Sequence, residues 1–329
     1  MTATDQIDAV YLWVDGSDPA HQALLARYGP AATQPSGTAD ARRFRDNGEL
    51  RSSLRSLERF APWIRHVYLV TNGQVPPWLN VPHPRLSLIT HEKIFPDRRD
   101  LPTFNSNAID LHIHRLPGLA ARYLLFNDDL FLGAPTTPDD FVTADGTYLV
   151  SVESRRVATD VSTGDAFRRA CARTAELLGK RFPDAGQPRV IAHVPQIYDS
   201  DVAREAQQEW PEAVKATSAH RLRDPTDLAW QLAYFGFALN HPTSRDRFRE
   251  RVLTNGSTEY VLMQLKNDPA AMNAHFSRLA SLRPRFFCIN DDLDESPEAA
   301  EVRTDFATFL ETFFPGPSSF EQRETVPVR

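Results

Sequence analysis

Apolar and polar stretches alternate along the chain in lengths that predict strands and helices in turn. Short β-branched and aromatic runs that end in turn-forming residues predict buried strands, and these runs lie at 7–14, 66–71, 86–90, 122–126 and 285–289. Apolar positions three and four apart predict helices, at 49–60, 108–116, 164–182, 199–217, 227–240 and 297–313. The alternation in the first half is typical of an α/β sheet domain, and the second half is more helical.

No linker or solenoid-type repeat interrupts this pattern, so we predict a single domain over residues 1–313. The last residues, 314–329, contain Pro, Ser and Glu, and we expect them to form a flexible tail. A small, polar, proline-containing segment at 30–40 is typical of a surface loop.

Composition narrows the class of protein. The 329 residues carry 37 Lys and Arg against 43 Asp and Glu, a net charge of −6, which argues against the broad basic surface used for nucleic-acid binding. No apolar run reaches the roughly 18 residues that span a bilayer, and the N-terminus lacks the features of a signal peptide. We therefore expect a cytoplasmic protein. Cys171 and Cys288 are expected to be small buried side chains.

Neighbouring carboxylates follow three of the predicted strands. They are Asp15 with Asp18, Asp128 with Asp129 in FNDDLF, and Asp291 with Asp292 in CINDDLD. Ligands of open α/β sheets bind at the carboxyl ends of strands, and hard cations such as Mg²⁺ or Mn²⁺ prefer oxygen ligands. Each pair alone is also compatible with a solvated turn or a helix cap. Three such pairs in one chain favour a metal or phosphate-chemistry site.

Basic and imidazole side chains supply the opposite charge. Arg45, Arg51 and Arg55 lie in or before a predicted helix and suit bidentate phosphate contacts. The alternative is a solvated helix face on which Arg55 pairs with Glu58. His193 follows a short apolar run, where an imidazole can act as general acid or base, or simply be a buried histidine with its hydrogen bonds made.

Several of these segments together resemble the conserved regions of the Stealth family. The first two regions resemble IDAVYLWVDGSDP, RDNGELRSSLRSLERFAPWIRHVYLVTNGQVPPWL, LPTFNSNAIDLHIHRLPGL and YLLFNDDLFLG. The third resembles AHVPQIYD with TSAHRLRDPTD, and the fourth resembles CINDD. In order along the chain, the regions fall at about 7–19, 42–133, 190–240 and 285–292.

The resemblance implies a sugar-phosphate transferase, an EC 2.7.8-like phosphotransferase. Family members include bacterial capsular and cell-wall polysaccharide phosphotransferases and the lysosomal-enzyme N-acetylglucosamine-1-phosphotransferase. They move a hexose 1-phosphate, such as N-acetylglucosamine 1-phosphate, from a UDP-sugar to an acceptor hydroxyl and release UMP. The resemblance also implies a Rossmann-like catalytic core related to GT-A glycosyltransferases, a mixed sheet flanked by helices, with Mg²⁺ (or Mn²⁺) as cofactor. The expected partners are a nucleotide-sugar donor and a glycan or sugar acceptor, without nucleic acid, and with at most peripheral association at the inner face of the membrane.

Site residues carry over from the family's motifs position by position. The catalytic candidates are Asp15, Asp18, Asp128, His193 and Arg221. The substrate-binding candidates are Arg45, Asp46, Asn47, Glu49, Arg51, Asn72, Ser106 and Asp110, the last standing where the family often has glutamate. The metal candidates are Asp128, Asp129, Asp291 and Asp292.

These candidates give a working mechanism. Asp128 with Asp291 or Asp292 would hold the metal, Arg51 and Arg221 would contact phosphate oxygens, and His193 or an aspartate of the first strand would deprotonate the acceptor.

Two other functions compete with this one. A GT-A-type glycosyltransferase would use the same metal but break the bond between the sugar and the phosphate, and would release UDP. A nucleotide-sugar-binding or assembly subunit would have no activity. The joint presence of acids, arginines and a histidine argues against the second, because a binding protein needs no acceptor base.

Overall fold

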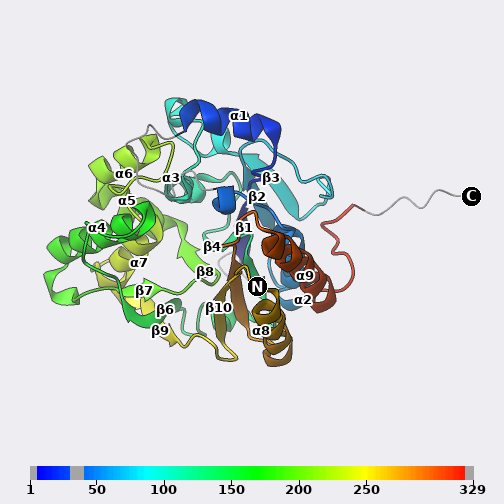
Figure 1. Cartoon of the computed structure of the whole chain (residues 1–329). Coiled ribbons are helices and arrows are strands. Elements are labelled where there is room, and N and C mark those ends of the chain that lie inside the picture. Colours follow the sequence, from blue (N-terminus) through cyan, green and yellow to red (C-terminus); the bar gives the residue numbers. More distant parts are fainter. Residues whose placement is uncertain (1–5, 30–40, 323–329) are drawn as a thin grey trace, which may run out of the picture.

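The computed structural model describes residues 6–29 and 41–322. A five-stranded sheet in the order β3-β2-β1-β4-β8 forms the centre, with four parallel strands and β8 antiparallel at one edge (Figure 1). Its strands are β1 (Ile7–Leu12), β2 (Val67–Thr71), β3 (Leu86–Thr90), β4 (Arg122–Asn127) and β8 (Gln196–Asp199). The predicted α/β architecture is confirmed: apolar runs that are buried on both faces form β1, β2 and β4, and the partly buried β3 lies at the edge.

Two smaller sheets lie beside the central one. The first has the order β10-β11-β5, made by β5 (Leu130–Leu132), β10 (Tyr260–Gln264) and β11 (Phe286–Asn290). The second has the order β7-β6-β9, made by β6 (Tyr148–Arg156), β7 (Arg189–Ile191) and β9 (Phe248–Leu253). Only Asp128 and Asp129 separate β4 from β5, so the chain leaves the central sheet and enters its neighbour at this acidic pair.

Helices cover both flanks of the sheets. They are α1 (Pro19–Tyr28), α2 (Glu49–Phe60), α3 (Ser106–His112), α4 (Ala166–Arg181), α5 (Ser200–Glu209), α6 (Pro211–Ala219), α7 (Trp230–Asn240), α8 (Pro269–Leu282) and α9 (Pro297–Phe313). In Figure 1, α4 to α7 gather on one side and α2, α8 and α9 on the other. The helix expected over 199–217 is two helices, because Pro211 has no N–H to continue α5 and begins α6 instead. No helix in the described ranges combines the length and the apolar character needed to cross a membrane.

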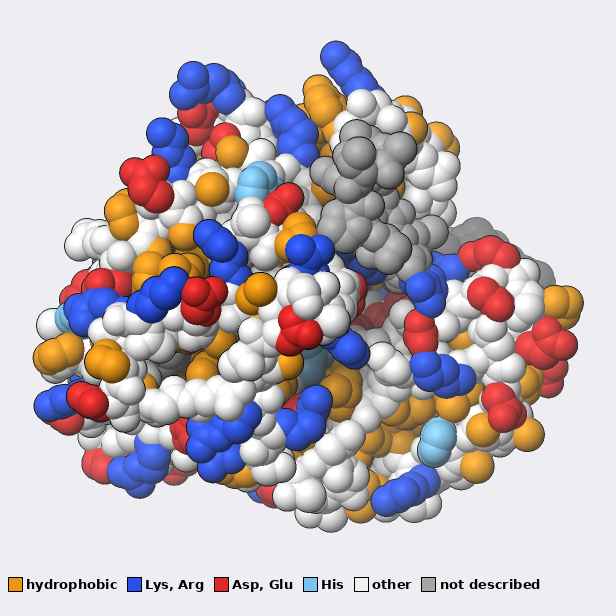
Figure 2. All heavy atoms as spheres, turned by 60° about the vertical axis from the view of Figure 1, so that its left-hand side comes forward, with side chains coloured by type: hydrophobic (Ala, Val, Ile, Leu, Met, Phe, Trp, Pro, Cys, Tyr) orange, Lys and Arg blue, Asp and Glu red, His pale blue; other side chains and the backbone are white. Residues whose placement is uncertain are grey.

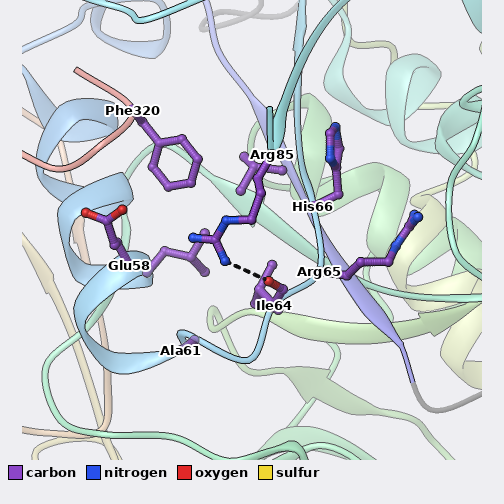
Figure 3. A pocket seen from close by; sticks show the side chains of 9 residues that line it. Glu58, Ala61, Ile64, Arg65, His66, Arg85 and Phe320 are labelled. Atoms are coloured by element: carbon purple, nitrogen blue, oxygen red, sulfur yellow. Dashed lines mark hydrogen bonds between the residues drawn. The ribbon is translucent and has the colours of Figure 1, made fainter. Parts of the chain in front are cut away.

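The C-terminal segment packs against the body of the protein. Phe314 and Phe320 are buried, and Glu321 is 3% exposed. Phe320 lines a small pocket of about 10 Å³ with Arg85, in which the guanidinium of Arg85 donates to the carbonyl of Ile64 (Figure 3). The prediction of a flexible tail over 314–329 is therefore wrong for 314–322. Residues 323–329, like the loop predicted at 30–40, lie outside the described ranges.

Two arginines of α2 compensate the charge of the buried Glu321. Its carboxylate accepts from Nε and Nη2 of Arg55, at 2.7 and 2.9 Å, and from Nε of Arg51. Nη1 of Arg55 donates to Glu311 of α9 at 2.7 Å. The structure thus gives both arginines a structural partner in place of the phosphate contacts expected for them, and Arg55 does not form the alternative pair with Glu58.

We expect Glu321→Gln to lower the free energy of unfolding by about 3 kcal/mol, since removing one member of a buried ion pair leaves the other charge uncompensated. Glu311→Gln is the matched control, because Glu311 pairs with the same arginine but its side chain is 56% exposed. Exposed pairs contribute about 1 kcal/mol or less. Urea unfolding of both variants at pH 7 measures the difference, and equal losses would contradict a structural role for the buried carboxylate.

Candidate active site

The turn between β4 and β5 is the centre of the site. Asp129 Oδ2 accepts from the Asn290 side-chain amide at 2.5 Å and from the Cys288 thiol at 3.4 Å. Asp129 Oδ1 lies 3.6 Å from Nε2 of His193, and these two buried atoms have no hydrogen-bond partner. Cys288 and Asn290 reach the same carboxylate because alternate residues of a strand share a face. The acidic turn, β11 and the residues after β7 therefore meet at Asp129.

Carboxylates crowd this turn and change one another's protonation. Burial raises the pKa of Asp128 well above its usual range, and the nearby Asp129, Glu49 and Asp46 raise it further. Burial also raises the pKa of Glu49 to about 8, although hydrogen bonds from Asn47 oppose the shift. A cluster with this excess of acid favours the binding of a cation.

Asp129 and His193 change each other's pKa in opposite directions: the pKa of Asp129 is lowered and that of His193 is raised. Burial by itself would raise the pKa of Asp129, but His193 and the hydrogen bonds from Cys288 and Asn290 bring it below its usual value. Burial would lower the pKa of His193, but the facing carboxylate raises it overall. Asp129 is therefore the ionised member of the acidic pair at neutral pH, and it stabilises a proton on His193.

The segment before α2 binds the residues that follow β11. Its Arg45 and Asn47 form hydrogen bonds with Asp291. The backbone N–H and side-chain amide of Asn47 donate to Glu49 at 2.5 and 2.8 Å, and the same amide donates to Asp291 at 3.2 Å. Nη1 of Arg45 donates to Asp291 at 2.7 Å. Gly48 has φ of +87°, a left-handed conformation that lets the chain turn into α2 directly after Asn47. Asn47 therefore connects Asp291, which follows β11, to Glu49, the first residue of α2.

Arg223 is a site residue that the sequence reasoning missed. Its Nη2 donates to Ser106 Oγ at 2.7 Å, and its Nε is buried without a hydrogen-bond partner. Burial raises the pKa of Asp110 to about 7, and the charge of Arg223 opposes that shift. The same guanidinium lowers the pKa of His193 and lies 5.1 Å from the ring centre of the exposed Phe167. Two of the predicted substrate residues, Ser106 and Asp110, are thus gathered around Arg223.

Arg221, the predicted basic residue of the third region, points elsewhere. Its Nη1 and Nη2 donate to the carbonyls of Pro102 and Arg99 at 2.8 and 3.1 Å, and its guanidinium lies over the ring of Tyr28. In the sequence RLRDPTD the two arginines are equivalent by type, so only their directions in the fold separate them. The described structure does not bring Arg221 or Arg51 to the acids.

The remaining candidates have contacts with other residues. Asp18 caps α1 by accepting from two backbone N–H groups, which gives it a structural role, whereas Asp15 lies close enough to raise the pKa of Asp46. The Nδ2 of Asn72 contacts Nδ1 of His21 at 3.1 Å. Asp292 turns outward, where its carboxylate pairs with Arg42 and with Lys266.

The chemistry of the donor set fits a hard divalent cation. Asp128, Asp129, Glu49 and Asp291 offer carboxylate oxygens from three segments, and Oδ1 of Asp129 is a buried acceptor without a donor. Near the middle of the face in Figure 2, acidic side chains are visible inside a hollow with Lys and Arg side chains on its rim. This combination can hold Mg²⁺ or Mn²⁺ beside a polyphosphate.

The pKa of Glu49 generates a test of this electrostatic picture. Its value in the folded state, about 8, is above the ordinary value of 4.5, so the folded protein binds a proton that the unfolded chain has released. Stability attributable to this group is therefore complete below about pH 4.5 and is lost as the pH rises through about 8. We expect Glu49→Gln to lose less stability than the wild type over that interval, measured as melting temperature against pH. Parallel curves for the two proteins would contradict the shift.

Comparison with known protein families gives four matches, in the order of the chain. Residues 5–32 match Stealth protein CR1, conserved region 1, and residues 43–150 match CR2, conserved region 2. Residues 192–240 match CR3, conserved region 3, and residues 277–327 match CR4, conserved region 4. The acidic turn, His193 with Arg223, and the strand β11 thus come from three different conserved regions.

Curated relatives match along almost the whole chain. An exopolysaccharide phosphotransferase of Streptomyces coelicolor is 36% identical over 97% of this chain and 53% of its own length. A second from the same organism is 38% identical, over 96% of this chain and 57% of its own length. The exopolysaccharide phosphotransferase CpsY of Mycobacterium tuberculosis is 32% identical over 96% of this chain and 58% of its own length. The chain therefore spans between half and three fifths of these relatives.

Solved structures match more distantly. The galactosyltransferase LgtC, in complex with donor and acceptor sugar analogues, is 10% identical, with a TM-score of 0.45 over 95% of this chain and 98% of that protein. Mouse xyloside xylosyltransferase 1 is 13% identical, with a TM-score of 0.38 over 86% of this chain and 97% of that protein. The four conserved regions, in their order, and the long alignments with the curated relatives show that this chain belongs to the Stealth family.

Proposed function

We propose that the site is that of a sugar-phosphate transferase of polysaccharide synthesis. The reaction moves a hexose 1-phosphate, such as N-acetylglucosamine 1-phosphate, from a UDP-sugar to a hydroxyl of a glycan, forms a phosphodiester and releases UMP. The proposal places the reaction in the cytoplasm, with at most peripheral contact at the inner face of the membrane. The names of the relatives support phosphotransfer. The observation that carries the proposal is the position of His193 Nε2, which has no hydrogen bond and lies 3.6 Å from the ionised Asp129 inside a cluster of acids.

His193 is the acceptor base in this proposal. Its Nε2 has no hydrogen-bond partner among the described residues and can take the proton of an acceptor hydroxyl while the hydroxyl oxygen attacks phosphorus. The bond between that phosphorus and the bridging oxygen of UMP then breaks, and its electron pair leaves with UMP. Asp129 stabilises the imidazolium that forms, because the carboxylate faces Nε2 at 3.6 Å.

Oxygen ligands and one guanidinium would neutralise the diphosphate. Asp128, Asp129 and Asp291 would hold Mg²⁺ or Mn²⁺, which when bound supplies positive charge to the phosphate oxygens and the leaving UMP. Arg223 replaces Arg51 and Arg221 as the phosphate-binding arginine, since its Nε has no partner and Ser106 holds its Nη2. A partly buried guanidinium is effective there because it can bind two phosphate oxygens at once.

Identification of the released nucleotide tests the reaction type. We expect the purified protein with UDP-N-acetylglucosamine and Mg²⁺ to release UMP, and EDTA to abolish the release. Asp128→Asn should lower the rate by at least about 100-fold, since the metal loses a carboxylate ligand. A metal-dependent release of UDP would move the assignment to glycosyl transfer. His193→Ala is the companion variant: it should bind the donor with unchanged affinity and lose transfer to an acceptor by about 100-fold or more.

The two arginines of the third region provide a matched pair. We expect Arg223→Gln to lower kcat/KM for the donor by about 100-fold, the cost of losing one preorganised charge-stabilising group. Arg221→Gln, two residues away, should stay within about threefold of the wild type, because its guanidinium binds backbone carbonyls away from the acids. Steady-state kinetics with circular dichroism as a folding control measures both. A larger loss for Arg221→Gln would reverse the assignment.

A further inference from the structure

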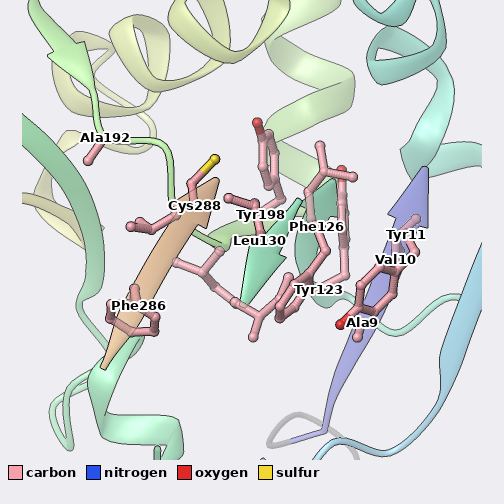
Figure 4. Close-up of a cluster of buried hydrophobic side chains, with 14 of the residues drawn as sticks. Ala9, Val10, Tyr11, Tyr123, Phe126, Leu130, Ala192, Tyr198, Phe286 and Cys288 are labelled. Carbon is pink, nitrogen blue, oxygen red and sulfur yellow. The ribbon is translucent and has the colours of Figure 1, made fainter. Parts of the chain in front are cut away.

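Cys288 has no part in the proposed reaction, yet it lies at its centre. It is fully buried on β11, opposite Leu130 of β5 (Figure 4). Its Sγ, one oxygen of Asp129 and one ring nitrogen of His193 all lie within 4.8 Å of one another. Sulfur, nitrogen and oxygen therefore converge on one point from β11, the residues after β7 and the turn after β4.

The spacing of these atoms is close to that of a tetrahedral metal site. Ligand atoms at the usual distances of about 2.0 to 2.3 Å from Zn²⁺ are about 3.3 to 3.8 Å apart. Here His193 Nε2 lies 3.6 Å from Oδ1 of Asp129, Cys288 Sγ lies 3.4 Å from the other oxygen of that carboxylate, and one atom from each residue lies within 4.8 Å of the other two. Nε2 and Oδ1 are buried without hydrogen bonds and are too far apart to bond each other. A cation between them would satisfy both atoms.

Neighbouring groups hold the three side chains in place. The Asn290 side-chain amide donates to Asp129 Oδ2 at 2.5 Å, and the backbone N–H of His193 donates to the hydroxyl of Tyr260 at 3.3 Å. Contacts of this kind orient metal ligands and increase affinity. The arrangement therefore needs little reorganisation to take up a cation.

We propose that Asp129, His193 and Cys288 form a site for a thiophilic divalent cation of the Zn²⁺ class. It shares Asp129 with the oxygen site proposed for Mg²⁺ but differs from that site in its nitrogen and sulfur ligands. Thiolate and imidazole select Zn²⁺ or Co²⁺ and discriminate against Mg²⁺. Three protein ligands leave a fourth position to water, and the thiol proton leaves to solvent when Sγ binds. If the proposed function holds, this cation inhibits transfer, because it occupies the base and its carboxylate partner.

Titration of the metal-free protein with Co²⁺ tests binding without any assay of activity. A cobalt–thiolate bond produces a charge-transfer absorption band in the near ultraviolet, which we expect for the wild type. The chain supplies its own control, since Cys171 on α4 lies outside the cluster. We expect Cys171→Ser to keep the band, Cys288→Ser to lose it, and His193→Ala to weaken Co²⁺ binding at least tenfold. Circular dichroism confirms that the variants are folded.

Absence of the band from the folded wild type would overturn the proposal, and so would its persistence in Cys288→Ser. The proposal of this metal site and the proposed transferase function can be contradicted independently of each other. A thiolate band without UMP release from any donor would leave the metal site standing and remove the proposed function. UMP release without a thiolate band would support the proposed function and remove the proposed metal site.

Discussion

A carboxylate at a corner between two sheets must have partners, because a buried charge without them costs several kcal/mol. Asp129 is placed there by the short step from β4 to β5, and it receives its partners from distant parts of the chain. β11 supplies a thiol and an amide, and the residues after β7 supply an imidazole. The partners of this one charge therefore come from segments that adjoin three different sheets, and they meet where the proposed chemistry would occur.

Two ion pairs between residues far apart in the sequence join α2 and the segment before it to the C-terminal part of the chain. Arg45 and Asp291 are 246 residues apart, and Arg55 and Glu321 are 266 apart. Both pairs join the segment around the start of α2 to the last part of the chain. The first pair positions an acid of the site, whereas the second lies at the surface of contact between α2 and the C-terminal segment. Arginines that in the sequence suggest a phosphate-binding face thus have two different uses. Arg45 positions an acid of the candidate site, and Arg55 holds the C-terminal segment.

The sequence patterns predicted the four parallel strands of the central sheet, the strand β11 and most helices, because burial of these runs leaves a direct trace in apolar periodicity. They did not predict the strands β5, β6 and β8 to β10 or the helices α1 and α8. The acidic strand ends were predictable for the same reason, since Asp128 and Asp129 follow an apolar run directly. The sequence pattern does not show in which direction a side chain points. Arg221 and Arg223 are alike in type and neighbourhood, but backbone carbonyls hold one and Ser106 holds the other. Alternation along β11 could have indicated Cys288 and Asn290, whereas the docking of 314–322 depends on Arg51 and Arg55 far away in the chain.

The order of the site segments along the chain has a consequence for biosynthesis. Translation adds Cys288, Asn290 and Asp291 after the acids that follow β4 and the imidazole of His193 have already left the ribosome. Until then the corner carboxylate lacks its thiol and amide, and the arginines of α2 lack Glu321. The nascent chain consequently holds an incomplete charge network until β11 has emerged, and non-local contacts of this kind close late in folding. A ribosome-bound chain would bring the whole acidic cluster together only after β11 has followed His193 out of the ribosome.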